Sequence, residues 1–136
     1  MTEQEVDDLI VSHVEEYGDI TFPKLVEFVD RATEIDPYGD INYFVRENDR
    51  FINCMVWHHM SEEFLEVWDR LWIITNPDGG RLDLHPLGAM EAFLIHSADG
   101  APMLNLPIAK KPPKGGYKKP RWLPCLVKPS PKDVKE

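Results

Sequence analysis

The composition of this chain changes abruptly at Pro107, and the change limits how much of the chain is expected to form a globular core. Residues 1–100 carry 22 acidic and 6 basic side chains, a net charge of −16, whereas residues 101–136 carry 2 acidic and 9 basic ones, a net charge of +7. Prolines and lysines crowd the second part and leave it without helical or strand periodicity. We therefore expect an acidic domain over residues 1–107 and a basic, proline-rich arm over residues 108–136.

Length and hydrophobic content favour one folded domain. The chain has 136 residues, of which 43% are hydrophobic, and these include four Trp, six Phe and four Tyr. The N-terminus is acidic from Glu3 onward and has no basic n-region, which is unlike a secretory signal. No apolar run approaches the roughly 18 residues of a spanning helix, and two cysteines make no disulfide framework. We expect a cytoplasmic protein with no membrane partner.

Three segments have the periodicity and the capping residues of helices. Thr2 followed by Glu5 is a capping box, and the helix it begins is expected to end at Gly18. A second helix is expected to start near Thr21, with Pro23 in its first turn and a very short strand at Ile20 before it. Ser61 is expected to cap a third one. The predicted buried face of this last helix comprises Phe64, Leu65, Trp68, Leu71 and Trp72.

The remaining segments suggest one more helix and several strands. Asp40 is expected to cap a short helix over Asp40–Arg50 that turns Ile41, Phe44 and Val45 inward, and a strand over Phe51–Trp57 follows it. The turn signal Asn76–Gly80 predicts a hairpin between Trp72–Thr75 and Arg81–His85. A second hairpin is expected where Ala92–His96 and Met103–Pro107 flank Ser97–Gly100. The fold class expected is α+β.

This order of elements over residues 2–85 resembles the winged-helix branch of helix-turn-helix proteins. The resemblance implies that residues 40–50 form the recognition helix and that the hairpin around Asp78-Gly79 is the wing. Acidic neighbours oppose phosphate binding, because they bring the local charge to −1. The side chains expected to reach base edges or phosphates are Asn42, Arg46, Asn48 and Arg50.

The basic arm is a second candidate for nucleic-acid binding, because it combines positive charge with an aromatic face on which a base can stack. Two other interpretations stay open. The arm can be a solvated polyproline-like tail, or its apolar residues around Trp122 can dock on the acidic domain or on a partner. The arm residues expected to bind nucleic acid are Lys110, Lys111, Lys114, Tyr117, Lys118, Lys119 and Arg121.

The acidic domain offers an alternative function in protein binding. In size and charge the chain is similar to small acidic proteins of mobile elements and phages that occupy nucleic-acid-binding clefts. An ordinary solvated acidic surface is the competing explanation. The residues expected to contact a protein partner are Glu62, Glu63, Glu66 and Trp122.

No residue pattern predicts catalysis, a metal or a cofactor. The adjacent His58 and His59 are expected to point to opposite faces of a strand, so they would need a bulge to bind one ion. Ser12 and His13 are neighbours within a helix, where their side chains diverge. There is no glycine-rich phosphate loop. We expect a protein that is not an enzyme and has no small-molecule substrate.

Two functions are therefore expected. The first is a small DNA-associated regulator of winged-helix type, and the alternative is an acidic interaction module or inhibitor that binds a basic, nucleic-acid-handling protein. The partner's identity and the oligomeric state stay open. Residues 1–107 are expected to fold without the arm.

Overall fold

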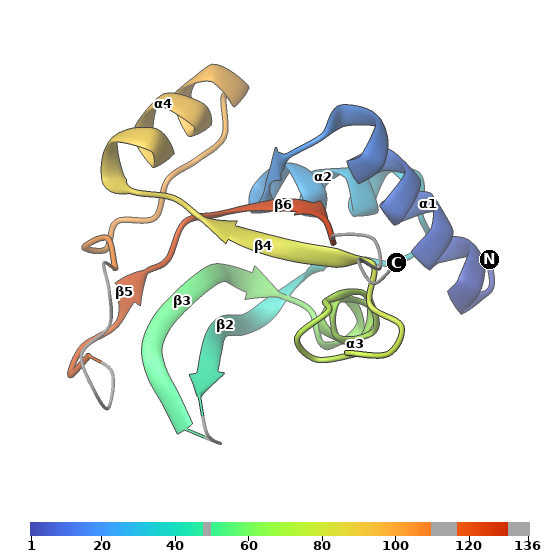
Figure 1. Ribbon diagram of the computed structural model, residues 1–136, viewed down its shortest axis with the longest axis horizontal. Coiled ribbons are helices and arrows are strands. Elements are labelled where there is room, and N and C mark those ends of the chain that lie inside the picture. Colours follow the sequence, from blue (N-terminus) through green and yellow to red (C-terminus); the bar gives the residue numbers. More distant parts are fainter. Residues whose placement is uncertain (48–49, 110–116, 131–136) are drawn as a thin grey trace, which may run out of the picture.

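The structure is a computed structural model that describes residues 1–47, 50–109 and 117–130 (Figure 1). Over these residues the chain has an α+β fold in which two small sheets pack with α1, α2 and α3, while α4 lies at the far end of β4. The described helices are α1 (Glu3–Tyr17), α2 (Phe22–Ala32), α3 (Glu62–Leu71) and α4 (Ala89–Asp99). The described strands are β1 (Ile20–Thr21), β2 (Tyr38–Glu47), β3 (Arg50–Met60), β4 (Leu82–Pro86), β5 (Arg121–Trp122) and β6 (Cys125–Pro129).

The expected starts of the first three helices are confirmed. Glu5 N donates to Thr2 Oγ1 at 3.1 Å while Thr2 N donates to Glu5 Oε1 at 2.7 Å, which completes the capping box of α1. Thr21 accepts a hydrogen bond from Lys24 N and thereby caps α2. Ser61 accepts one from Phe64 N at 3.0 Å and caps α3. These helix ends are set by residues close together in the sequence.

The first sheet has the strand order β1-β6-β4, so β6 is its central strand. Both pairs are antiparallel, with Thr21 opposite Leu126 and Leu84 opposite Val127. The second sheet has the order β2-β3-β5, with β5 parallel to β3 and Trp122 opposite Met55. Each sheet therefore joins a strand from beyond residue 120 to strands from the first two thirds of the chain.

The expected domain boundary at Pro107 does not hold for residues 117–130. Trp122 and Val127 belong to the same buried cluster as Val14, Phe22 and Trp68, so the arm supplies part of the main core. Of the open interpretations of the arm, docking on the acidic domain is the one that the structure supports for these residues. The physical reason is that burying the apolar side chains near Trp122 lowers the free energy, while the flanking lysines can keep their charged ends in water.

The short helix expected over Asp40–Arg50 is wrong. The described residues of this segment belong instead to β2 and to the first position of β3, and these two long strands pair antiparallel with Tyr43 opposite Trp57. Ile41, Phe44 and Val45 have helical spacing, but they are also good strand formers beside another apolar strand. Pairing with β3 outweighed the local capping signal of Asp40.

Both expected later hairpins are also wrong. The turn at Asn76–Gly80 forms, since Gly80 N donates to Asn76 O at 2.7 Å. The chain before the turn makes only an isolated parallel bridge between Trp72 and Leu82, whereas β4 pairs along its length with β6. The segment Ala92–His96 is part of α4, whose first turn is capped by Gly88 N donating to Glu91 Oε1 at 3.2 Å. The two elements that the winged-helix resemblance assigned to DNA are thus a strand and a turn before β4.

Candidate functional site

The residues predicted to contact DNA do not share a helix. Asn42 is an exposed residue of β2, and the hairpin register places Arg46 opposite Phe51 and Arg50 opposite Glu47. Asn48 lies outside the described residues. These positions follow a strand and the end of a hairpin, so the segment offers no recognition helix to a major groove.

The predicted basic arm forms a small corner beside β5. Lys118 and Lys119 are exposed, and the Arg121 guanidinium lies 4.6 Å from the centre of the Tyr117 ring. Asn53 Nδ2 donates to the backbone oxygen of Tyr117 at 2.7 Å and holds this corner on β3. Because Arg121 already covers one face of the ring, that face cannot stack on a base. Three further predicted residues lie outside the described residues: Lys110, Lys111 and Lys114.

The residues predicted to bind a protein partner separate in the structure. Trp122 is 1% exposed and packs in the main core, so it is not accessible to a partner. Its burial follows from the pairing of β5 with β3, which no local pattern indicated. Glu62, Glu63 and Glu66 remain exposed on α3.

Two of these glutamates line an acidic groove between α1, α3 and the segment that follows α2. The groove has a volume of about 200 Å³. Glu63 and Glu66 are one helical turn apart on α3, Glu3 comes from the first turn of α1, and Glu34 follows the end of α2. The complete lining is Met1, Thr2, Glu3, Val6, Glu34, Ile35, Glu63, Glu66, Val67 and Arg70.

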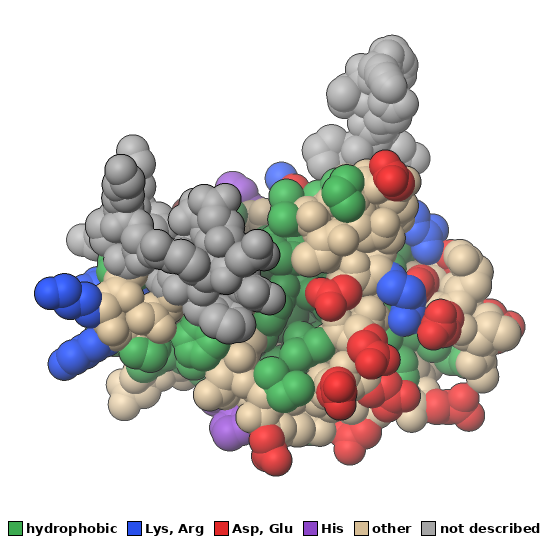
Figure 2. All heavy atoms as spheres, turned by 90° about the horizontal axis from the view of Figure 1, so that it is seen from below, with side chains coloured by type: hydrophobic (Ala, Val, Ile, Leu, Met, Phe, Trp, Pro, Cys, Tyr) green, Lys and Arg blue, Asp and Glu red, His purple; other side chains and the backbone are tan. Residues whose placement is uncertain are grey.

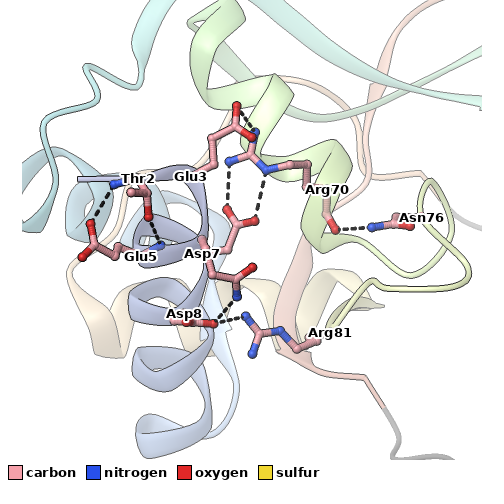
Figure 3. A network of polar contacts seen from close by, with 9 residues as sticks. Thr2, Glu3, Glu5, Asp7, Asp8, Arg70, Asn76 and Arg81 are labelled. Atoms are coloured by element: carbon pink, nitrogen blue, oxygen red, sulfur yellow. Dashed lines mark hydrogen bonds and ion pairs between the residues drawn. The ribbon is translucent and has the colours of Figure 1, made fainter.

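The one basic side chain in the groove is already paired within the chain. Arg70 Nε and Nη2 donate to the two carboxylate oxygens of Asp7 at 3.0 and 2.9 Å, and Glu3 Oε2 lies 3.7 Å from Arg70 Nη1 (Figure 3). This two-pronged pair is half-buried and raises the pKa of the Arg70 guanidinium. Asp8, the next residue of α1, accepts a hydrogen bond from Arg81 Nη2 at 2.6 Å. Acids of α1 therefore neutralise both nearby arginines.

The carboxylates of the groove outnumber its cations. Glu34 Oε1 lies 3.1 Å from the Met1 ammonium and forms an ion pair with it, so the excess negative charge comes from Glu63 and Glu66. The side chains of Glu3 and Glu34 are 81% and 83% exposed, and Glu63 and Glu66 are exposed as well. The pKa of Asp69, on the same helix, is raised by burial and then by the negative charge of Glu66.

The acidic surface covers one end of the molecule. In Figure 2 the Asp and Glu side chains gather over the half of this face where α1 and α3 lie, and Lys and Arg side chains project at the opposite end, on the side of β5. The charge asymmetry seen along the sequence is therefore also an asymmetry in space, even though residues 117–130 fold into the acidic domain.

Only the α3 side of the groove follows from the sequence. Glu63 and Glu66 were predicted to contact a partner and line the groove, whereas Glu62 was predicted with them and does not line it. Glu3 and Glu34 line the groove but were not predicted. Glu3 was visible only as an acidic residue in the first turn of a helix, where acids are common. Glu34 gave no local signal, because its place depends on how α2 packs beside α1 and α3.

The two adjacent histidines do not alternate as the sequence suggested. His59 has a φ of 54°, which breaks the strand geometry and brings the His58 and His59 rings to 4.3 Å between their centres. Burial and the neighbouring His59 lower the pKa of His58. In the described residues, no three His, Cys, Asp or Glu side chains come together as a possible metal site.

Comparison with protein-family models, with curated proteins and with solved structures finds no match for this chain. Within the described ranges, every helix is too short or too polar to cross a bilayer. The fold and the groove thus define a small α+β protein with an acidic surface groove.

Proposed function

We propose that this protein is a non-catalytic interaction module that binds a basic, nucleic-acid-handling protein through its acidic groove. The observation that carries the proposal is the charge balance of the groove: four exposed carboxylates meet two cations, the Arg70 guanidinium that Asp7 already neutralises and the Met1 ammonium that Glu34 binds. A lysine or arginine side chain entering this groove gains Glu63 and Glu66 as carboxylate partners without displacing Asp7 from Arg70 or Glu34 from Met1.

The expected class of partner follows from charge complementarity. Proteins that handle nucleic acids present grooves of Lys and Arg to the phosphate backbone, and a dense acidic surface is attracted to the same grooves. Long-range attraction of this kind speeds association and weakens as salt is added. An inhibitor that occupies such a groove is the simplest activity that a surface of this charge supports.

The DNA-associated regulator is the weaker alternative. It relied on a recognition helix that includes Arg46 and Arg50, and that segment is a hairpin. The acidic end formed by α1 and α3 also repels phosphates. The feature that still favours nucleic acid is the basic corner formed by the exposed Lys118 and Lys119 and the half-buried Arg121, so duplex DNA is a second probe.

Reversing two charges in the groove is expected to weaken binding of a basic ligand strongly. The probe is a fluorescent peptide of alternating Arg and Lys, titrated by anisotropy near physiological salt. We expect Glu63→Lys with Glu66→Lys to weaken binding by about tenfold or more, because two attractive contacts become repulsive. Glu63→Gln with Glu66→Gln should give a smaller loss in the same direction.

A matched control separates the groove from net charge. Glu15→Lys with Glu16→Lys changes the net charge by the same amount at exposed positions of α1 that do not line the groove. We expect this control to weaken binding by about twofold at most, through long-range attraction alone. Equal losses in both double variants would contradict the groove as the binding site, and saturable binding of duplex DNA near physiological salt would favour the regulator.

A further inference from the structure

Helix α4 has two faces of opposite character, and the inner face fixes it to the rest of the fold. Ala92 and His96 are buried, and Ile95 packs with the cluster of Leu87 and Leu126. His96 Nδ1 lies 2.8 Å from Pro102 O. The centre of the His96 ring is also 5.1 Å from that of Trp122. The orientation of α4 is therefore set by packing on the core side.

The outer face of α4 is apolar and exposed. Met90, Phe93 and Leu94 are spaced three and four residues apart and are 71%, 55% and 58% exposed. Ser97 and Ala98 continue the same line and are also exposed. We call these five residues the α4 stripe. Successive residues of a helix are rotated by about 100° around its axis. This rotation places the α4 stripe on the side of the helix away from Ala92 and His96.

Contiguous apolar surface on a helix usually marks an interface, and here two features indicate what covers it. The first is charge. The chain carries a net −9, so copies of it repel one another, but the α4 stripe contains no charged residue. It also lies at the other end of the molecule from the acidic helices α1 and α3 (Figure 1). Two copies can meet there with the least electrostatic cost.

The second feature is the order of side-chain sizes along the helix. Large residues occupy the first half of the α4 stripe and the small Ser97 and Ala98 occupy the second half. In an antiparallel pair about a twofold axis near Leu94, Met90 of one helix lies opposite the small residues of the other. The large side chains then fill the space that the small ones leave, and opposite ends of the two helix dipoles are adjacent.

We propose that the α4 stripe joins two copies of this chain in an antiparallel, twofold-symmetric dimer. The proposal goes beyond the proposed function because it uses a different surface and leaves both acidic grooves open. With about 200 Å² for a large apolar side chain, the exposed fractions of the three large residues correspond to roughly 350–400 Å² per copy. This is about half of the roughly 800 Å² per partner in a standard stable interface. The dimer is accordingly weak and depends on concentration.

Sedimentation equilibrium of the full chain tests the dimer. From about 1 µM to about 500 µM, the average mass should rise from the monomer value of 15.7 kDa toward twice that value. Phe93→Lys should keep the mass at the monomer value throughout, because it places charge in the pair. Ile74→Lys is the matched control, since Ile74 is 65% exposed but lies outside α4. Wild-type protein that stays monomeric at every concentration overturns the proposal. The proposal is also overturned if Ile74→Lys prevents dimer formation as fully as Phe93→Lys does.

Cross-linking tests the symmetry of the pair independently. Leu94→Cys should form a disulfide-linked dimer under mild oxidation, because the twofold axis brings the two copies of this position together. Ile74→Cys provides the control for random collision. The native Cys54 and Cys125 are both buried, so they do not compete for the cross-link. If the two variants cross-link at equal rates, the antiparallel arrangement is wrong.

Discussion

A chain truncated after Pro107 is expected to lose cooperative folding. The truncation removes β6, the central strand of the first sheet, and leaves β1 and β4 without a partner. It also removes Trp122 and Val127 from the main core, where each is at most 1% exposed. Burial of one such large side chain contributes about 2–3 kcal/mol, and domains of this size are stable by only about 5–15 kcal/mol. Urea unfolding followed by circular dichroism measures the loss.

A point variant of β6 separates the role of the strand from that of chain length. Val127→Asp places a carboxylate in a fully buried position and is expected to unfold much of the protein. Lys128→Asp changes the next residue, which is half-buried at the sheet surface, and is expected to leave the unfolding midpoint nearly unchanged. A truncated chain that still unfolds cooperatively would show that residues 1–107 form the domain.

Trp68→Ala is expected to cost about 3–5 kcal/mol of unfolding free energy. The ring is fully buried on α3, with the centre of Phe22 at 5.3 Å and that of Trp72 at 5.9 Å. Trp68 Nε1 also donates to Tyr43 Oη at 2.9 Å. Burial raises the pKa of Tyr43, so its phenol stays neutral. In Trp68→Ala this buried hydroxyl loses the indole N–H that it accepts from, which adds to the cost of the lost packing.

The conservative variant Trp68→Phe divides the cost into packing and hydrogen bonding. It keeps an aromatic ring in the core but removes the indole donor, so we expect a loss of about 1–3 kcal/mol, smaller than that of Trp68→Ala. Linear extrapolation of urea unfolding measures both values. A loss below about 1 kcal/mol for the alanine variant would mean that this face of α3 is not part of the core.

The sequence was informative wherever structure depends on neighbours along the chain. Thr2 and Ser61 identify the starts of α1 and α3, because the cap contacts a backbone amide only three residues away. Burial of Trp68 also followed from helical spacing alone. The exposure of Glu62, Glu63 and Glu66 on α3 also followed from helical periodicity, while their binding role remains a proposal.

Ambiguous local patterns account for several errors. The segment from Asp40 to Val45 suits a helix by spacing and a strand by residue type, and only the neighbouring β3 decides between them. Ala92–His96 was predicted as a strand because it is short and apolar. Its helix is revealed by the Glu91 cap and by Gly100, whose φ of 67° ends the helix in a left-handed conformation.

By itself, the sequence determined the capped helices, the α+β class and the separation of charge, because each depends on residue type and short-range order. Only the tertiary structure decided that β6 lies between β1 and β4, and that Glu34 joins Glu63 in one groove. These placements bring together residues tens of positions apart, such as Thr21 and Leu126. The energy that selects them comes from burying apolar surface shared by distant segments, and no local pattern records which segments share it.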